Sequence, residues 1–146
     1  MPDATAFRVH IYDRLLATGL PPTIRELANH YGASEAEARR WIAELKIGKT
    51  ILPHPLTGEI WMAGPFASAK TPYKVIGERV TWWANCAWDM LGIAMISGET
   101  VRIHSQCTDC DEPMTLKAGP QQKPDVDGVV HFLVPARHWY DDIGFT

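Results

Sequence analysis

The sequence is short of several features that would place the protein in a special class. It has three cysteines among 146 residues, an odd number and too few for the disulfide framework of a small secreted protein. No apolar run reaches the roughly 18 residues that a membrane span needs, and the N-terminus does not resemble a signal peptide. We therefore expect a protein of the reducing cytoplasm with no membrane partner.

The sequence also has no large excess of positive or negative charge. The formal net charge is −3 with 21% charged residues, so the chain as a whole is not attracted to nucleic acid or to an anionic membrane. No internal repeat or long low-complexity segment is visible. With 46% apolar residues, the chain can bury a sizeable core, either in one domain or in two small ones.

The first third of the chain predicts helices with well-marked ends. Apolar residues at helical spacing predict a first helix that ends before Gly19. Two capping-box pairs, each a hydroxyl residue followed three positions later by glutamate, predict helices over about 24–30 and 35–46. An apolar stretch with a central turn follows at 51–66. This order is typical of a winged helix-turn-helix domain, which we place at residues 1–66.

A winged helix raises the question of DNA binding. The second capped helix and its exit carry a nearly balanced set of charges: Arg39, Arg40, Lys46 and Lys49 against Glu35, Glu37 and Glu44. Contacts with phosphate need a concentrated basic face. We therefore expect this domain to act as a scaffold for the rest of the chain and not to bind nucleic acid.

The remainder of the chain predicts a second unit. Residues 67–76 resemble a linker, and residues 77–146 begin with a predicted helix over about 78–97. After this helix the apolar period changes to two, which predicts strands at 100–105, 114–118 and 129–134. The predicted fold class is therefore α+β: a winged-helix-like unit of three helices, followed by a helix packed on a small antiparallel sheet.

The stretch Trp-Trp-Ala-Asn-Cys-Ala-Trp-Asp at 82–89 combines a thiol and a carboxyl in apolar surroundings. In a helix, the spacing of three places Cys86 and Asp89 on one face, about 5–6 Å apart at Cβ. Three tryptophans around them would exclude water and shift the proton affinity of both groups. A buried cysteine is usually inert packing, and the carboxyl could have a purely structural role as a cap. An unpaired carboxyl in an apolar site is costly, however, which favours a functional pair.

Four segments of the second half form a recognisable pattern. They are Asn-Cys-Ala-Trp-Asp-Met-Leu, Gly-Glu-Thr-Val-Arg-Ile-His-Ser-Gln-Cys, Glu-Pro-Met-Thr-Leu and Val-His-Phe-Leu-Val-Pro. From about residue 50 to its end, the chain resembles the alkylmercury (organomercurial) lyase family. This resemblance implies a lyase that cleaves carbon–mercury bonds by protonolysis and needs no cofactor, with Hg(II) as a ligand derived from the substrate. By position, Cys86 matches the family's first catalytic cysteine and Asp89 matches its acid.

The chemistry of the two side chains agrees with these roles. Hg(II) is a soft cation that prefers thiolate ligands. Thiolates on mercury make the bonded carbon more basic, and a carboxylic acid held nearby can then deliver the proton as a general acid. In a dry site Asp89 would have a raised pKa and could be protonated at neutral pH. The implied partners are a small organometallic substrate and a thiol or a mercury-accepting reductase.

One part of the family pattern falls at the end of the sequence. The family's second catalytic cysteine follows an aromatic residue about a dozen positions after the Val-Pro that matches Val134-Pro135, which here corresponds to Phe145-Thr146. We expect either a truncated form or a short homologue, in which the two-thiol mechanism is not assembled in the family's way. The alternatives to a lyase are a homologue that binds soft metal or another ligand without turnover, and a winged-helix regulator that responds to metal.

Cys107-Thr-Asp-Cys110 is a Cys-x-x-Cys motif at the expected end of a strand. The plain interpretation is two reduced thiols in a turn, and a redox pair is an alternative. As a zinc site the motif offers half of the four ligands required, with His104 and His131 as the nearest supplements. A further hypothesis is that Cys107 or Cys110 supplies a second thiolate to Cys86.

Overall fold

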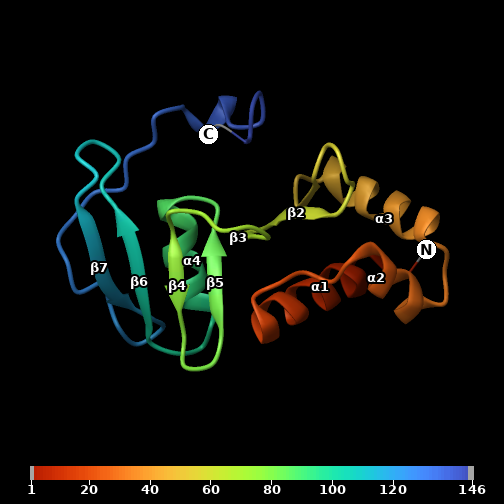
Figure 1. Cartoon of the computed structure of the whole chain (residues 1–146), viewed down its shortest axis with the longest axis horizontal. Coiled ribbons are helices and arrows are strands. Elements are labelled where there is room, and N and C mark those ends of the chain that lie inside the picture. The colour runs from red at the N-terminus through yellow and green to blue at the C-terminus, as the bar shows by residue number, and fades with distance from the viewer. Residues whose placement is uncertain (1, 145–146) are drawn as a thin grey trace.

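Three helices form the N-terminal part of the structure, a computed structural model that describes residues 2–144. They are α1 (Ala4–Thr18), α2 (Ile24–Tyr31) and α3 (Glu35–Ile47) (Figure 1). Capping boxes begin both α2 and α3, at Thr23 and Ser34, as the sequence predicted. Because each box satisfies backbone N–H groups that lack a partner in the first turn, these two starts are fixed by local sequence.

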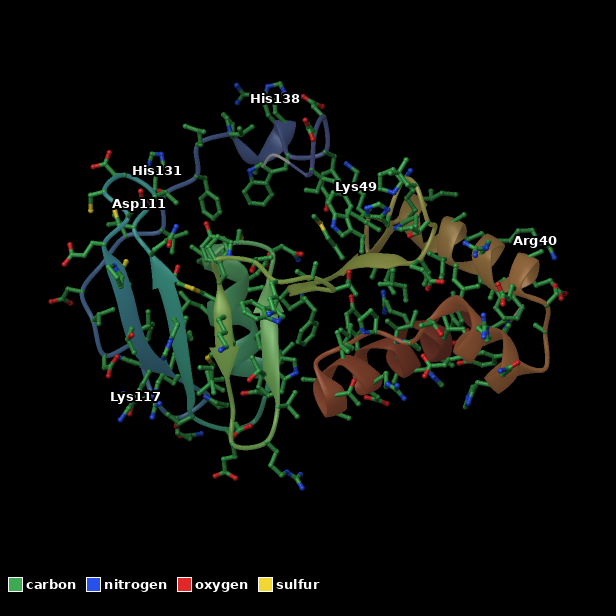
Figure 2. All side chains as sticks on the ribbon, in the orientation of Figure 1. Arg40, Lys49, Asp111, Lys117, His131 and His138 are labelled. Atoms are coloured by element: carbon green, nitrogen blue, oxygen red, sulfur yellow. The ribbon has the colours of Figure 1, made fainter. Side chains whose placement is uncertain are left out.

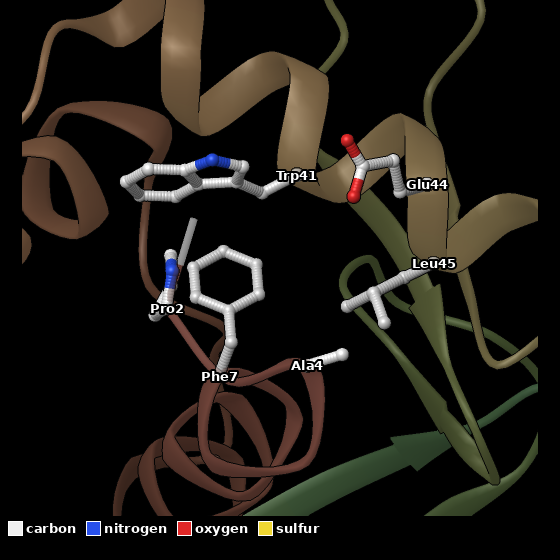
Figure 3. Close-up of a pocket in the computed structure, with 6 residues that line it drawn as sticks. All are labelled: Pro2, Ala4, Phe7, Trp41, Glu44 and Leu45. Carbon is white, nitrogen blue, oxygen red and sulfur yellow. The ribbon is translucent and has the colours of Figure 1, made fainter.

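The apolar faces of the three helices meet in one core. Phe7, Ile11 and Leu15 of α1 are buried, in agreement with their helical spacing. Phe7 meets Trp41 of α3 edge-on, with the ring centroids 5.6 Å apart. The pocket beside these two rings has a volume of about 10 Å³ (Figure 3). At most one water molecule fits there, so it is a gap in the packing and not a ligand site.

The described residues form seven strands in one antiparallel sheet. In chain order they are β1 (Ile51–Pro53), β2 (Ile60–Ala63), β3 (Phe66–Ala67), β4 (Lys74–Ile76), β5 (Thr81–Ala84), β6 (Val101–Gln106) and β7 (Pro113–Ala118). Their order in the sheet is β1-β2-β3-β5-β4-β6-β7, so the sheet runs from the hairpin beside α3 to the hairpin β6–β7 (Figure 1). Residues 67–76, predicted as a linker, contain β4 and the end of β3. The fold is α+β, as predicted.

Two predicted elements are wrong. The helix predicted over 78–97 begins later, as α4 (Ala87–Ile96), because residues 81–84 form β5. Those four residues alternate between half-buried and buried, which is the period of a strand. Residues 129–134, predicted as a strand, form none in the structure. These residues are mostly exposed, with Val129 95% exposed. Their alternating apolar residues therefore do not pair with another strand of the described sheet.

Helix α4 covers the sheet and fixes the position of its own N-terminus. Its buried residues are Met90, Ile93 and Ala94, and it contacts β4, β5, β6 and β7. The segment after β7 includes a short 3-10 turn (Ala136–His138) and returns across the end of the sheet at which α4 begins (Figure 1). Among the helices that the structure describes, none is both long enough and apolar enough to cross a membrane.

Candidate functional site

Cys86 and Asp89 lie together at the start of α4. Cys86 is the N-cap residue, with an extended backbone (φ −149°, ψ 179°), and Asp89 is in the first helical turn. The Cys86 Sγ donates a hydrogen bond to Oδ2 of Asp89 over 3.4 Å. The predicted pairing of the two side chains is therefore present. It arises at a strand-to-helix corner and not in the middle of a helix.

Burial raises the pKa of both groups. For Asp89, burial outweighs the hydrogen bonds with the side chains of Cys86 and Asn85, which lower its pKa. For Cys86, burial is again the main cause of the raised pKa, and the negative charge of Asp89 adds to it. The pair therefore holds protons more tightly than the same groups would in water.

The pair opens into a cavity of about 540 Å³. This volume is in the range of small-molecule binding sites. Its walls come from the region around β1 and β2, from residues 67–73, from the start of α4 and from the C-terminal segment. The aromatic and cationic residues that line it are Trp61, Tyr73, Trp88, Phe132, Trp139, Tyr140, Lys49 and Lys70.

The tryptophans next to Cys86 in the sequence do not enclose it as predicted. Trp82 is buried in β5, where its indole N–H donates to the carbonyl of Leu15 over 2.9 Å. Trp83 is half-buried and does not line the cavity. Trp88 does line the cavity, but it is 63% exposed. Much of the aromatic wall comes from residues far from Cys86 in the sequence.

The C-terminal segment forms one side of the cavity. The ammonium group of Lys49 lies 4.0 Å from the centroid of the Tyr140 ring, which joins the β1 side to this segment. Lys49 lies on the side of the molecule that faces the segment carrying His138 (Figure 2). Phe145 and Thr146, where the spacing predicted the position of the family's second cysteine, lie outside the described residues.

The second half of the chain matches a known protein family. The model of the family described as alkylmercury lyase matches residues 66–145, more than half of the sequence. The chain belongs to the alkylmercury lyase family.

Among solved structures, the crystal structure of the mercury-bound form of MerB2 has a similar fold, with a TM-score of 0.63. The two chains are 19% identical, and the match covers 86% of this chain and 61% of the other. The chain therefore spans 61% of the length of that protein. At this identity the likeness concerns the fold alone. The curated proteins gave no match.

Two residues beside the Cys86–Asp89 pair were not identified from the sequence. Tyr73 lines the cavity, and its pKa is raised by burial and further by the nearby Cys86. Asn85 donates its side-chain N–H to the carbonyl of Gly64 over 2.9 Å, which ties the corner before α4 to the β2–β3 turn. No pattern in the sequence pointed to Tyr73. For Asn85 the one available signal was its position directly before Cys86.

Cys107 and Cys110 lie in the turn between β6 and β7 and do not line the cavity. Both are free thiols, with Cys107 half-buried and Cys110 exposed. Hydrogen bonds from the backbone N–H groups of Asp109 and Cys110, and from the Cys110 side chain, lower the pKa of Cys107. Within residues 2–144, no three His, Cys, Asp or Glu residues come together as a metal site. The alternative of a zinc site at Cys107 and Cys110 therefore finds no completed ligand set among these residues.

The two C-terminal histidines lie at the surface. His131 is exposed and, contrary to its predicted place in a strand, lies in an irregular segment. His138 is exposed, and its Nδ1 lies 2.8 Å from Oδ2 of Asp141. Neither histidine lines the cavity that contains Cys86.

Proposed function

We propose that the protein cleaves carbon–mercury bonds by protonolysis, with Cys86 as the mercury ligand and Asp89 as the proton donor. The observation that carries this proposal is the hydrogen bond from Cys86 Sγ to Asp89 Oδ2 inside a cavity large enough for an organic group. Membership of the alkylmercury lyase family supports the class of reaction.

In the first step, the substrate would replace the proton of the Cys86 thiol. Mercury forms a bond with Sγ, its previous ligand leaves as an anion, and the thiol proton passes to Asp89, its hydrogen-bond partner. Burial raises the pKa of this carboxyl, which favours its protonated form once the thiol has become a mercury thiolate.

In the second step, Asp89 would return that proton to the carbon. The electron pair of the carbon–mercury bond becomes the new carbon–hydrogen bond, and the hydrocarbon leaves. Asp89 is again a carboxylate, and Hg(II) remains on Cys86. A further thiolate must complete the coordination of the metal. We propose that it comes from a thiol in solution or from a mercury-accepting reductase.

The cavity suits an apolar or aromatic organic group on the mercury. Its walls carry the rings of Trp61, Phe132 and Trp139 together with the apolar side chains of Leu52 and Met62. Apolar walls around a few polar groups are the usual composition of a small-molecule site.

A second candidate is a homologue that binds an organomercurial and does not release hydrocarbon. The observation that favours it is the cavity lining, in which Cys86 is the one cysteine among the described residues. Without a second thiolate, the carbon on mercury is less basic and accepts a proton more slowly. The same Cys86 adduct would then be the end of the reaction.

We propose that α1–α3 and the hairpin β1–β2 form a winged-helix-like scaffold over residues 1–66, with the lyase-like core in 77–146. Two basic residues of α3 already have partners within the chain. Arg39 donates to the carbonyl of Thr57 over 2.7 Å, and Arg40 lies 3.9 Å from Glu37. We therefore do not expect this unit to bind nucleic acid. A mobility-shift assay at low salt would detect the alternative, a regulator that binds DNA in response to metal. A cytoplasmic location remains part of this proposal.

The experiment that tests the function separates binding from cleavage. Phenylmercury is added to the protein with excess small thiol, the adduct is measured by intact mass and benzene is measured by gas chromatography. We expect the wild type to form the adduct and release benzene. Asp89→Asn should keep the adduct and lose roughly 100- to 10,000-fold in release, the usual contribution of a general acid.

The control is Asp141→Asn, a surface carboxyl outside the cavity lining, which should behave as the wild type. Benzene release by Asp89→Asn at the wild-type rate would show that Asp89 is not the donor. A wild type that keeps its adduct and never releases benzene would identify the binding homologue.

A further inference from the structure

We propose that Cys107 and Cys110 form a second metal site, which binds inorganic Hg(II) between two thiolates at the surface, apart from the Cys86 cavity. This binding does not depend on lyase activity. Its use as an acceptor of the Hg(II) released at Cys86 rests on the proposed function.

The turn between β6 and β7 carries both cysteines, three residues apart, and backbone hydrogen bonds close it. The N–H of Cys107 donates to the carbonyl of Glu112, and the N–H of Asp111 donates to the carbonyl of Cys107, each over 2.9 Å. Asp111 completes the turn with a left-handed backbone (φ 58°). Within this closed turn, the N–H groups of Asp109 and Cys110 and the Cys110 side chain lower the pKa of Cys107.

The ligand set selects the kind of metal. A structural zinc ion takes four ligands, and the residues described, 2–144, bring no third His, Cys, Asp or Glu to the two thiols. Soft cations select thiolates over oxygen ligands, and two thiolates are sufficient for Hg(II). On binding, both thiols give their protons to solvent, two sulfur–mercury bonds form, and no oxidation state changes.

The position of the pair lets it act independently of the cavity. Cys110 is exposed, and neither cysteine lines the cavity that contains Cys86. Asp111, in the same turn, lies well apart from Lys49 at the cavity (Figure 2). In a transfer, each thiolate of the pair would replace one ligand of Hg(II), and Cys86 would take up a proton as it is released.

The test uses HgCl₂ and the full chain with Cys86→Ser, which leaves the pair as the remaining thiols. After an excess of a small monothiol, retained mercury is counted by native mass spectrometry. We expect one Hg(II) per chain. Adding Cys107→Ser or Cys110→Ser should weaken retention by roughly 100-fold or more, because the second bond is no longer intramolecular. Adding Thr108→Ala, in the same turn, should leave retention unchanged.

Two results would overturn the proposal. One is equal retention after loss of either cysteine of the pair, which means that a single thiol holds the metal. The other is complete loss of retention in Cys86→Ser, which means that Cys86 shares one metal with this turn. Circular dichroism confirms that each variant is folded. Failure of the lyase proposal would appear as absent benzene release and would leave this mercury count as it is.

Discussion

Cys86 and Cys107 present the same thiol in two different surroundings. At the cavity, burial raises the pKa of Cys86, and Asp89 beside it adds to the effect. At the turn, backbone N–H groups directed at sulfur lower the pKa of Cys107. In the proposed reaction, the first thiol would keep its proton until mercury displaces it, and the proton would stay available to Asp89. The second ionises readily and suits the capture of a free cation.

The largest expected difference between the two regions is in cleavage. Cys86→Ser should reduce benzene release from phenylmercury by roughly 1,000-fold or more, since the mercury ligand is lost. Cys107→Ser should change single-turnover release by less than about twofold, because that residue lies outside the cavity lining. Gas chromatography measures both. Similar losses in the two variants would show that Cys107 takes part in the reaction.

The two regions should also respond to pH in opposite directions. Release from a preformed Cys86 adduct needs protonated Asp89, so the rate should fall about tenfold per pH unit above the raised pKa of that carboxyl. Mercury binding at the turn releases protons, so retention should strengthen as the pH rises toward the pKa of Cys107. Because that pKa is lowered, the increase should occur at a lower pH than for an ordinary thiol. Single-turnover release and native mass spectra, each measured over a pH series, check the two trends. A release rate that rises with pH would contradict the role of Asp89 as donor.

Alkylation compares the two thiols directly. Because Cys107 ionises more readily and Cys86 is partly buried, iodoacetamide at neutral pH should modify Cys107 roughly tenfold faster. Asp89→Asn removes the negative charge beside Cys86, so it should speed up modification of Cys86 and leave Cys107 unchanged. Peptide mass spectrometry gives both rates. A faster Cys86 in the wild type would mean that its surroundings favour the thiolate.

The smallest expected effect is on stability. Cys86 occupies the N-cap of α4 and makes no side-chain cap hydrogen bond. Serine is a preferred N-cap residue, so Cys86→Ser should raise the free energy of unfolding by about 1 kcal/mol and the melting temperature by about 2–4 °C. Cys107→Ser should stay within about 0.5 kcal/mol of the wild type. Thermal unfolding followed by circular dichroism measures both, and a destabilised Cys86→Ser would show that the bond to Asp89 matters more than the cap.

Local sequence predicted those parts of the structure that local interactions determine. The capping boxes of α2 and α3 lie within four residues, so their starts could be predicted. Trp82 and Trp83 belong to β5 because β3 and β4 lie on either side of it, which an isolated apolar run does not reveal. The pairing of Cys86 with Asp89 survived this error, since an N-cap residue and the third residue of a helix also lie three apart.

The walls of the cavity could not be predicted in the same way. Lys49, Trp61 and Tyr140 come together through tertiary packing, and none stands in a motif. The family resemblance pointed to Cys86 and Asp89 as the proposed reacting groups, because the motif lies in one short segment of sequence. It did not locate the residues that surround the substrate. Those residues follow from the order of the strands and from the path of the segment after β7.

The path of that segment also determines when the site can be completed during synthesis. Chains are made from the N-terminus at about 5–20 residues per second, so Cys86 emerges seconds before Tyr140. In that interval the thiol and Asp89 lack the wall to which Phe132, Trp139 and Tyr140 contribute. A nascent chain exposed to an organomercurial could thus take up the metal before it can shield the carbon from water. Of the cavity walls described above, the one after β7 is therefore made last.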